Sequence, residues 1–197
     1  GTVADMVPLL GENRYLVKQG LKVINTSPRL GIREMMTNTG LSEGKLESDS
    51  ISWNLAPRLN AAGRLAHAMS SYRLLTTESP QEANELATWL EQKNTKRQRL
   101  TTKTVALARE QVLAEGILPL LVAGDKDFSI GICGLVASRL AEEFYRPAVV
   151  IRTGEQVSRG SCRSIPEFNI IEALARCHDL FTHFGGHSQA AGFTLPT

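Results

Sequence analysis

The pattern of polar and apolar residues predicts one unusually long helix in the middle of the chain. Residues 80–115 contain no glycine and no internal proline after Pro80. Ser79 stands three residues ahead of Glu82, which is the spacing of a capping box, and Pro80 suits the first turn. Apolar side chains recur near both ends of the stretch at helical spacing: Leu86, Leu90, Val105, Ala108 and Val112. We therefore expect a continuous helix over residues 80–115.

The middle of this helix, residues 91–104, has almost no apolar stripe. It carries a group of basic residues against the single acid Glu91: Lys93, Lys96, Arg97, Arg99 and Lys103. A helix that is polar on all sides usually crosses solvent between two domains. A solvated connector explains this segment, and so does a basic wall that attracts a phosphate backbone.

The segment before the long helix predicts a short strand followed by helices. Residues 2–4 resemble the end of a buried strand, which would deliver Asp5 to the edge where α/β sheets bind ligands. Helices are expected over residues 13–26 and 32–37. A lone carboxylate has nothing to work with at a strand end, and the chain opens at Gly1 without a methionine. We therefore expect a piece of a longer protein.

Beyond Gly116 the pattern changes to short strands and helices. Strands are expected over residues 118–124, 147–153, 157–164 and 189–195, and helices over 134–145 and 169–180. Asn169 and Glu172 have capping-box spacing at the start of the last helix. This alternation predicts a compact α/β domain.

Composition adds limits on function and location. The net charge of +2 is too small to indicate a nucleic-acid partner by itself. Three cysteines without a CxxC pair favour a reducing, cytoplasmic compartment. No apolar run approaches the roughly 20 residues of a membrane span.

Two segments carry polar side chains suited to binding an anion. In PRLNAAGRL, residues 57–65, Asn60 and Arg64 lie among small residues, so backbone could approach a ligand and Arg64 could fork onto a phosphate. Taken alone, the segment is better explained as a turn with an incidental arginine. In RGSCRS, residues 159–164, a strand would present Ser161 and Arg163 on one side, beside Gly160. An exposed strand edge with ordinary polar residues is the alternative.

A third segment, FGGHSQAAGF at residues 184–193, predicts a loop in which Gly185 and Gly186 precede His187. Such a loop could bring amide groups and an imidazole to a phosphate, although a tight turn with a surface histidine also explains it. Zinc must be weighed, because four zinc-type side chains lie within eleven residues: Cys177, His178, His183 and His187. The paired ligand dyads of structural zinc sites are missing, which argues against zinc.

Five blocks in this order resemble the single-stranded-DNA-specific exonucleases of the DHH phosphoesterase superfamily: GTVADMVPL, PRLNAAGRL, GLVASRL with RPAVVI, RGSCRS and FGGHSQAAG. The resemblance covers essentially the whole chain. It implies that residues 1–78 are the last part of a DHH catalytic domain, 79–115 a connecting helix, and 116–197 a smaller DHH-associated domain with a mixed sheet.

The same resemblance assigns roles to residues. Asp5 matches a metal ligand and catalytic residue of a site for two divalent ions, Mn²⁺ or Mg²⁺. Asn60, Arg64, Ser161 and Arg163 match residues that hold the 5′-terminal phosphate and nearby backbone. The GGH block matches a motif facing the active site, with His187 catalytic and Gly185 and Gly186 contacting nucleic acid. Residues 127–131 read DFSIG where many family members have Trp-His, so any contact of that histidine is absent here.

The implied activity is 5′ to 3′ hydrolysis of single-stranded DNA to 5′-mononucleotides, in DNA repair and recombination. Single-strand-binding proteins or helicases are the expected kinds of partner, and no pattern in the chain identifies one. With one ligand of the two-metal site, residues 1–197 alone are expected to bind no metal and to be inactive. Two alternatives stay open: a DHH phosphoesterase for short oligoribonucleotides or nucleotide bisphosphates, and a nucleic-acid-binding module without catalysis.

Overall fold

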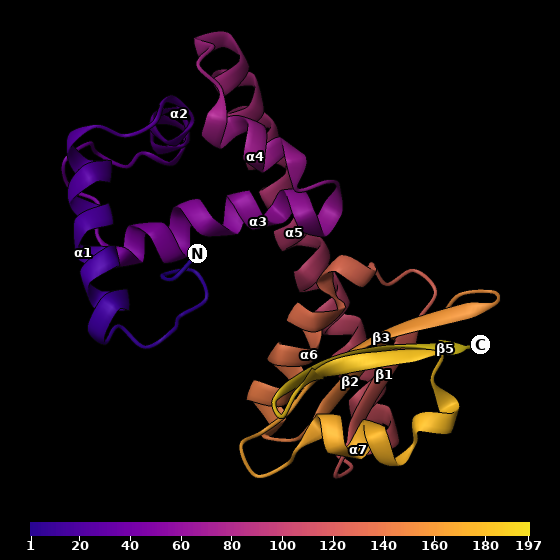
Figure 1. Ribbon diagram of the computed structural model, residues 1–197. Helices are drawn as coiled ribbons and strands as arrows, with labels where there is room; N and C mark the ends of the chain where they lie inside the picture. Colours follow the sequence, from indigo (N-terminus) through magenta and orange to yellow (C-terminus); the bar gives the residue numbers. More distant parts are fainter. The chain divides into compact units, whose positions relative to one another are not determined.

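The computed structural model describes residues 1–197, and the chain divides into two compact units, Gly1–Arg97 and Gln98–Thr197 (Figure 1). The predicted long helix is confirmed as α5, Pro80–Glu115, and its two halves contribute to different units. Its first turn is capped as the sequence indicates, because the Glu82 amide donates to the Ser79 hydroxyl at 3.3 Å. Hydrogen bonds from Thr77 and Arg73 lower the pKa of Glu82.

The first unit is helical throughout. It contains α1 (Gly11–Thr26), α2 (Leu30–Thr39), a π-helical segment (Ser50–Leu55), α3 (Ala56–Leu65), α4 (Met69–Thr76) and the first part of α5. Its core combines buried side chains from α2, α4 and α5, including Met35, Met36, Leu74 and Leu90. The two helices predicted before α5 are confirmed, with α2 longer than expected and ended by Gly40 in the left-handed conformation.

Two expectations for this unit were wrong. Residues 2–6 form a turn rather than a strand end, with the Asp5 amide donating to the Gly1 carbonyl at 2.9 Å. The unit contains no strand to pair with this segment, so its amides bond locally. The PRLNAAGRL segment is helix α3 rather than a turn, because alanine, leucine and arginine favour helix and Pro57 stands in the first turn, where it costs little.

The second unit is an α/β domain around a five-stranded mixed sheet, as predicted. The strands are β1 (Leu121–Asp125), β2 (Ala148–Arg152), β3 (Val157–Arg163), β4 (His183–His187) and β5 (Ala190–Pro196), in the order β1-β2-β3-β5-β4. Only the β1–β2 pair is parallel. Strand β5 therefore lies between β3 and β4, although it is last in the sequence.

Helices cover the two faces of this sheet (Figure 1). Helix α6 (Ile130–Phe144) packs with the second part of α5 on one face, over a core that includes Ala148 and Val150 of β2. Helix α7 (Ile170–Arg176) packs on the other face, with Val149, Cys162 and Phe193. A short 3₁₀ turn, His178–Leu180, follows α7. Alternate residues of each strand consequently enter different cores.

The second unit also departs from the sequence prediction in four places. Helix α7 ends at Arg176, whereas the helix was expected to run to residue 180. Strand β1 begins at Leu121 rather than residue 118, and α6 begins at Ile130 rather than 134. Gly131 and Gly134 lower the helix propensity of the first turns of α6, so the sequence pattern did not indicate a helix before residue 134. The FGGHSQAAGF loop is instead the hairpin of β4 and β5. Its strand character depends on pairing with β5 and cannot be read from a glycine-rich segment alone.

Candidate nucleic-acid interface

Ser161 and Arg163 lie on one face of β3, as the strand spacing predicted. Cys162, which lies between them in sequence, is buried in the core on the α7 side, and the preceding Gly160 is buried against Phe193 of the same core. The Arg163 Nη1 atom lies 3.4 Å from the Ser161 hydroxyl oxygen and donates to the Cys162 carbonyl at 2.7 Å. The guanidinium is thus folded back beside the hydroxyl, which places two anion-binding donors together.

Gly134 of α6 makes room for this pair, and the sequence analysis missed its role. A β-carbon at Gly134 would lie 3.0 Å from both the Arg163 Nη2 atom and the Ser161 Oγ atom. A glycine inside a helix costs roughly 0.5–1 kcal/mol relative to alanine. The signal available in the sequence was a glycine inside an otherwise good helical pattern, which indicates close approach by another group.

The strand register brings the GGH block onto the same face. Ser161 of β3 pairs with Gly192 of β5, which pairs with Gly185 of β4. Arg163, Ala190 and His187 form the neighbouring row. Adjacent strands are about 4.8 Å apart, so the backbones of Arg163 and His187 are roughly 10 Å apart, with Ala190 of β5 between them.

The two glycines of the GGH block have different structural roles. Gly186 has φ +153°, and a β-carbon there would lie 2.3 Å from the Ala190 carbonyl oxygen, so the hairpin itself requires glycine. A β-carbon at Gly185 would meet nothing within 4 Å. Packing therefore does not explain Gly185, and its effect is to keep the surface beside Ser161 and His187 low and open.

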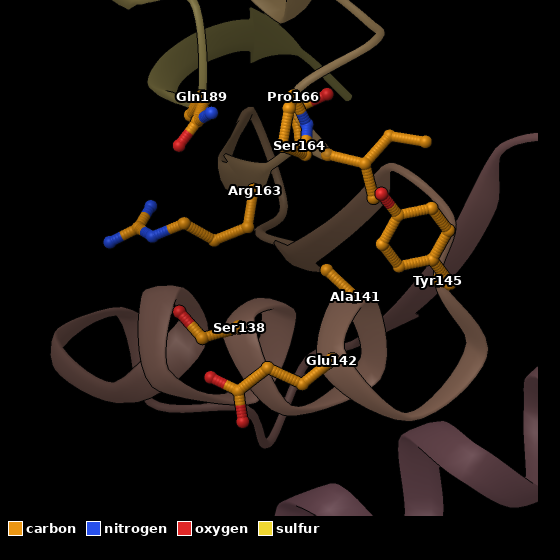
Figure 2. Close-up of a pocket in the computed structure, with 9 residues that line it drawn as sticks. Ser138, Ala141, Glu142, Tyr145, Arg163, Ser164, Pro166 and Gln189 are labelled. Atoms are coloured by element: carbon orange, nitrogen blue, oxygen red, sulfur yellow. The ribbon is translucent and has the colours of Figure 1, made fainter.

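Arg163 also borders a cavity of about 390 Å³ on the second unit. Figure 2 shows its side chain extending between Gln189 of the β4–β5 turn and Ser138 of α6. Ala141, Ile165 and the Tyr145 ring supply apolar lining, and the Tyr145 hydroxyl donates to Glu167 at 2.9 Å. Arg163 is thus reachable from this cavity as well as standing beside Ser161.

In the first unit, Arg64 belongs to a cluster of arginines. Burial, then the positive charges of Arg64 and Arg58, lower the pKa of Arg97. The Arg97 guanidinium donates to the buried Asn94 side chain at 2.8 Å. Arg58 forms an ion pair with Glu91, and Asn60 is exposed on α3. Arg64, Arg97 and Asn60 were predicted from the sequence, and Arg58 was not, because its ion pair with Glu91 depends on helix α3 lying beside α5.

Asp5 is exposed in the N-terminal turn. Within residues 1–197, no three His, Cys, Asp or Glu side chains gather closely enough to hold a metal ion. The zinc-type residues considered above are therefore not brought together. The role of Asp5 as a metal ligand stays a prediction. None of the helices is long and apolar enough to cross a bilayer.

The domain class follows from this fold and a family comparison. Residues 111–197 match the model of the DHHA1 domain. The second unit, with its mixed sheet and the GGH hairpin, is therefore a DHHA1 domain.

Relatives of the whole chain place it more closely. It is 40% identical over 198 residues to the single-stranded-DNA-specific exonuclease RecJ of Bacillus subtilis, covering 99% of this chain and 25% of that protein. It is 36% identical to RecJ of Thermus thermophilus, covering 99% and 28%, and 34% identical to RecJ of Escherichia coli, covering 99% and 36%. The predicted relation to the RecJ exonucleases is confirmed, and the chain spans between a quarter and just over a third of their length.

Solved structures agree with this assignment. The crystal structure of Thermus thermophilus RecJ in complex with Mg²⁺ matches with a TM-score of 0.86 at 34% identity, over 98% of this chain and 30% of that one. The corresponding Mn²⁺ complex also gives 0.86, over 98% and 28%. A further RecJ bound to manganese gives 0.80, over 98% and 48%.

Proposed function

We propose that residues 1–197 hold the 5′ end of the substrate in a 5′ to 3′ exonuclease specific for single-stranded DNA. The observation that carries this proposal is the gathering of Ser161, Arg163, Gly185 and His187 on one face of the sheet, next to helix α6. The RecJ relatives, named as single-stranded-DNA-specific exonucleases, supply the substrate class. The expected biological setting is DNA repair and recombination in the cytoplasm.

The chemistry of this face suits a terminal phosphate. Arg163 supplies a planar fork of donors, and Ser161 supplies a hydroxyl within 3.4 Å of it. The low surface at Gly185 lets a phosphate approach the backbone closely. Contacts of this kind position a strand and carry no base information, so we expect little dependence on base identity and a strong dependence on salt.

In the first unit, the arginine cluster of Arg58, Arg64 and Arg97 is a second concentration of positive charge. Arg58 is paired with the Glu91 carboxylate, and the charges of Arg64 and Arg58 both act on Arg97. Guanidinium groups placed this close repel one another, and an anion relieves that repulsion. We propose that Arg64, with the exposed Asn60 nearby on α3, contacts the sugar-phosphate backbone of the strand.

Hydrolysis itself needs more than these residues. A hard divalent cation prefers carboxylate oxygen, which the exposed Asp5 offers, but such a site takes several oxygen ligands. We propose that Asp5 is one ligand of a two-ion site in the full-length protein. There the Mn²⁺ or Mg²⁺ ions would activate water and stabilise charge on the phosphodiester. His187, exposed on the sheet face, would act as a catalytic residue by donating to a phosphodiester oxygen.

Residues 1–197 by themselves should therefore bind DNA weakly and not cut it. The test incubates the purified chain with 5′-labelled single-stranded DNA and Mn²⁺. We expect no labelled mononucleotide and binding that falls steeply with salt. Metal-dependent release of mononucleotide would contradict the assignment of Asp5 as a single ligand.

The assignment of the terminal phosphate site is tested by Arg163→Ala in the full-length protein. Hydrolysis of 5′-phosphorylated strands should fall by about tenfold or more, and hydrolysis of 5′-hydroxyl strands should change little. Arg176→Ala is the matched control, because Arg176 is an exposed arginine of α7 on the opposite side of the sheet. An equal loss on both substrates would show that Arg163 does not read the terminal phosphate.

A further inference from the structure

A second pair of cationic side chains repeats the arrangement of Arg163 and His187 further along the same strands. Arg159 of β3 pairs in register with Thr194 of β5, and Thr194 pairs with His183 of β4. Arg159 and His183 each precede their counterparts by four residues. Since alternate residues of a strand share a face, both Arg/His pairs lie on the same side of the sheet. In each row a β5 residue, Ala190 or Thr194, lies between the arginine of β3 and the histidine of β4.

The second pair is too far from the first to hold the same phosphate. Four residues along a strand correspond to about 13 Å. The row of Arg163 and His187 is thus separated from the row of Arg159 and His183 by the row that contains Ser161, and one phosphate does not span both outer rows. A single strand whose 5′ end is held at Arg163 has further phosphates, and these can follow the line of small residues formed by Ala190, Gly192 and Thr194.

The charge around Arg159 is unfavourable in the free protein. Arg152 of β2 lies directly opposite Arg159 in the antiparallel register, on the same face. Like charges opposite each other on neighbouring strands are destabilising, and neither arginine forms an ion pair in the structure. Asp125 of β1 is the register neighbour of Arg152. One of its carboxylate oxygens accepts a hydrogen bond from the Asp127 amide at 2.7 Å.

We propose that Arg159, Thr194 and His183 form a second phosphate subsite that binds an internal phosphate of the strand, with Arg152 adding to its charge. The subsite rests on the proposed function, because it presumes a strand whose end lies at Arg163. Arg159 would supply a guanidinium fork, Thr194 a hydroxyl and His183 a ring N–H. The surface would therefore follow at least two phosphates of one strand rather than hold only its end.

The test compares two ligands in the full-length protein without hydrolysis, in the presence of a metal chelator. One is a 5′-phosphorylated thymidylate dodecamer and the other is thymidine 5′-monophosphate. Arg159→Gln should weaken binding of the dodecamer by about five- to tenfold and lower its salt slope by about one, with monophosphate binding unchanged. Arg159→Lys should recover part of the affinity, and the control Arg176→Gln should change neither ligand.

The outcomes separate this subsite from the proposed function. If Arg163→Gln weakens both ligands and Arg159→Gln weakens neither, the second subsite is wrong and the terminal site stands. Equal loss of both ligands in Arg159→Gln would also overturn it, because Arg159 would then act at the terminal phosphate. If neither substitution affects either ligand, the proposed function is what fails. Arg159→Gln should also melt at the same or a higher temperature, since it removes a like-charge pair.

Discussion

Gly134 of α6 lies directly against the guanidinium of Arg163. A β-carbon added at Gly134 would lie 3.0 Å from the Arg163 Nη2 atom. Glycine at this position is less favourable for the helix than alanine, but its missing side chain leaves space for Arg163 and Ser161 beneath α6. This contact ties the position of the proposed phosphate-binding pair to a residue that would never touch the phosphate.

Gly134→Ala should therefore separate stability from binding. The added methyl displaces the flexible end of Arg163, so affinity for a 5′-phosphorylated strand should fall several-fold, and thermal stability should stay the same or rise because alanine favours helix. Gly20→Ala is the control, since Gly20 lies in α1 with nothing within 4 Å of its would-be β-carbon. Parallel melting and binding curves for the two variants decide the matter, and unchanged binding in Gly134→Ala would contradict the role given to this contact.

Gly160→Ala should destabilise the second unit. A β-carbon at Gly160 would lie 2.1 Å from the Phe193 ring, which is buried against the α7 core. The ring must move, and overpacking of this kind costs about 1–3 kcal/mol. Urea unfolding followed by circular dichroism measures the loss. A stability equal to that of the unsubstituted protein would show that Phe193 relaxes without cost.

Gly185→Ala should weaken binding and leave stability unchanged, in contrast to Gly160→Ala. Nothing lies within 4 Å of a β-carbon at this position, so the free energy of unfolding should change little. The methyl group would occupy the surface where the proposed phosphate approaches, and we expect about a tenfold weaker affinity for the 5′-phosphorylated strand. Anisotropy titrations against the 5′-hydroxyl strand provide the comparison, which should show a smaller effect.

Glu91→Gln should weaken the first unit through its arginine cluster. The side chain of Arg58 is only 17% exposed and is paired with Glu91. Loss of the carboxylate leaves Arg58 near Arg64 and Arg97 without compensation, at a cost of about 1–2 kcal/mol. Inorganic phosphate should restore part of the loss by neutralising the cluster. Glu110→Gln, an exposed position in the same helix, should show neither effect.

The cysteines should differ in reactivity. Burial raises the pKa of Cys133 to about 11 and that of Cys162 to about 12, so both thiols are protonated and unreactive at pH 8. Cys177 is exposed. A thiol reagent at pH 8 should titrate one cysteine rapidly and the other two only after denaturation. Cys177→Ser should remove the rapid phase, and its persistence would place another thiol at the surface.

Local signals in the sequence were sufficient for most of the helices. Helix α5 follows from the Ser79 cap and from the absence of glycine and of internal proline through residue 115, and both are properties of the segment itself. The alternation of Ser161 and Arg163 to one face likewise follows from the period of a strand. Each of these predictions needed only neighbours within a few residues.

Only the tertiary structure decided how the separate segments combine. The strand expected at residues 2–4 is a turn, and the loop expected at the GGH block is a strand, because strands exist only where a partner supplies hydrogen bonds. The insertion of β5 between β3 and β4 sets the rows that join Arg163 to His187 and Arg159 to His183. Register is fixed by pairing between distant segments, so no local pattern could reveal these rows. The sequence thus determined which side chains are available, and the pairing of strands determined which of them meet.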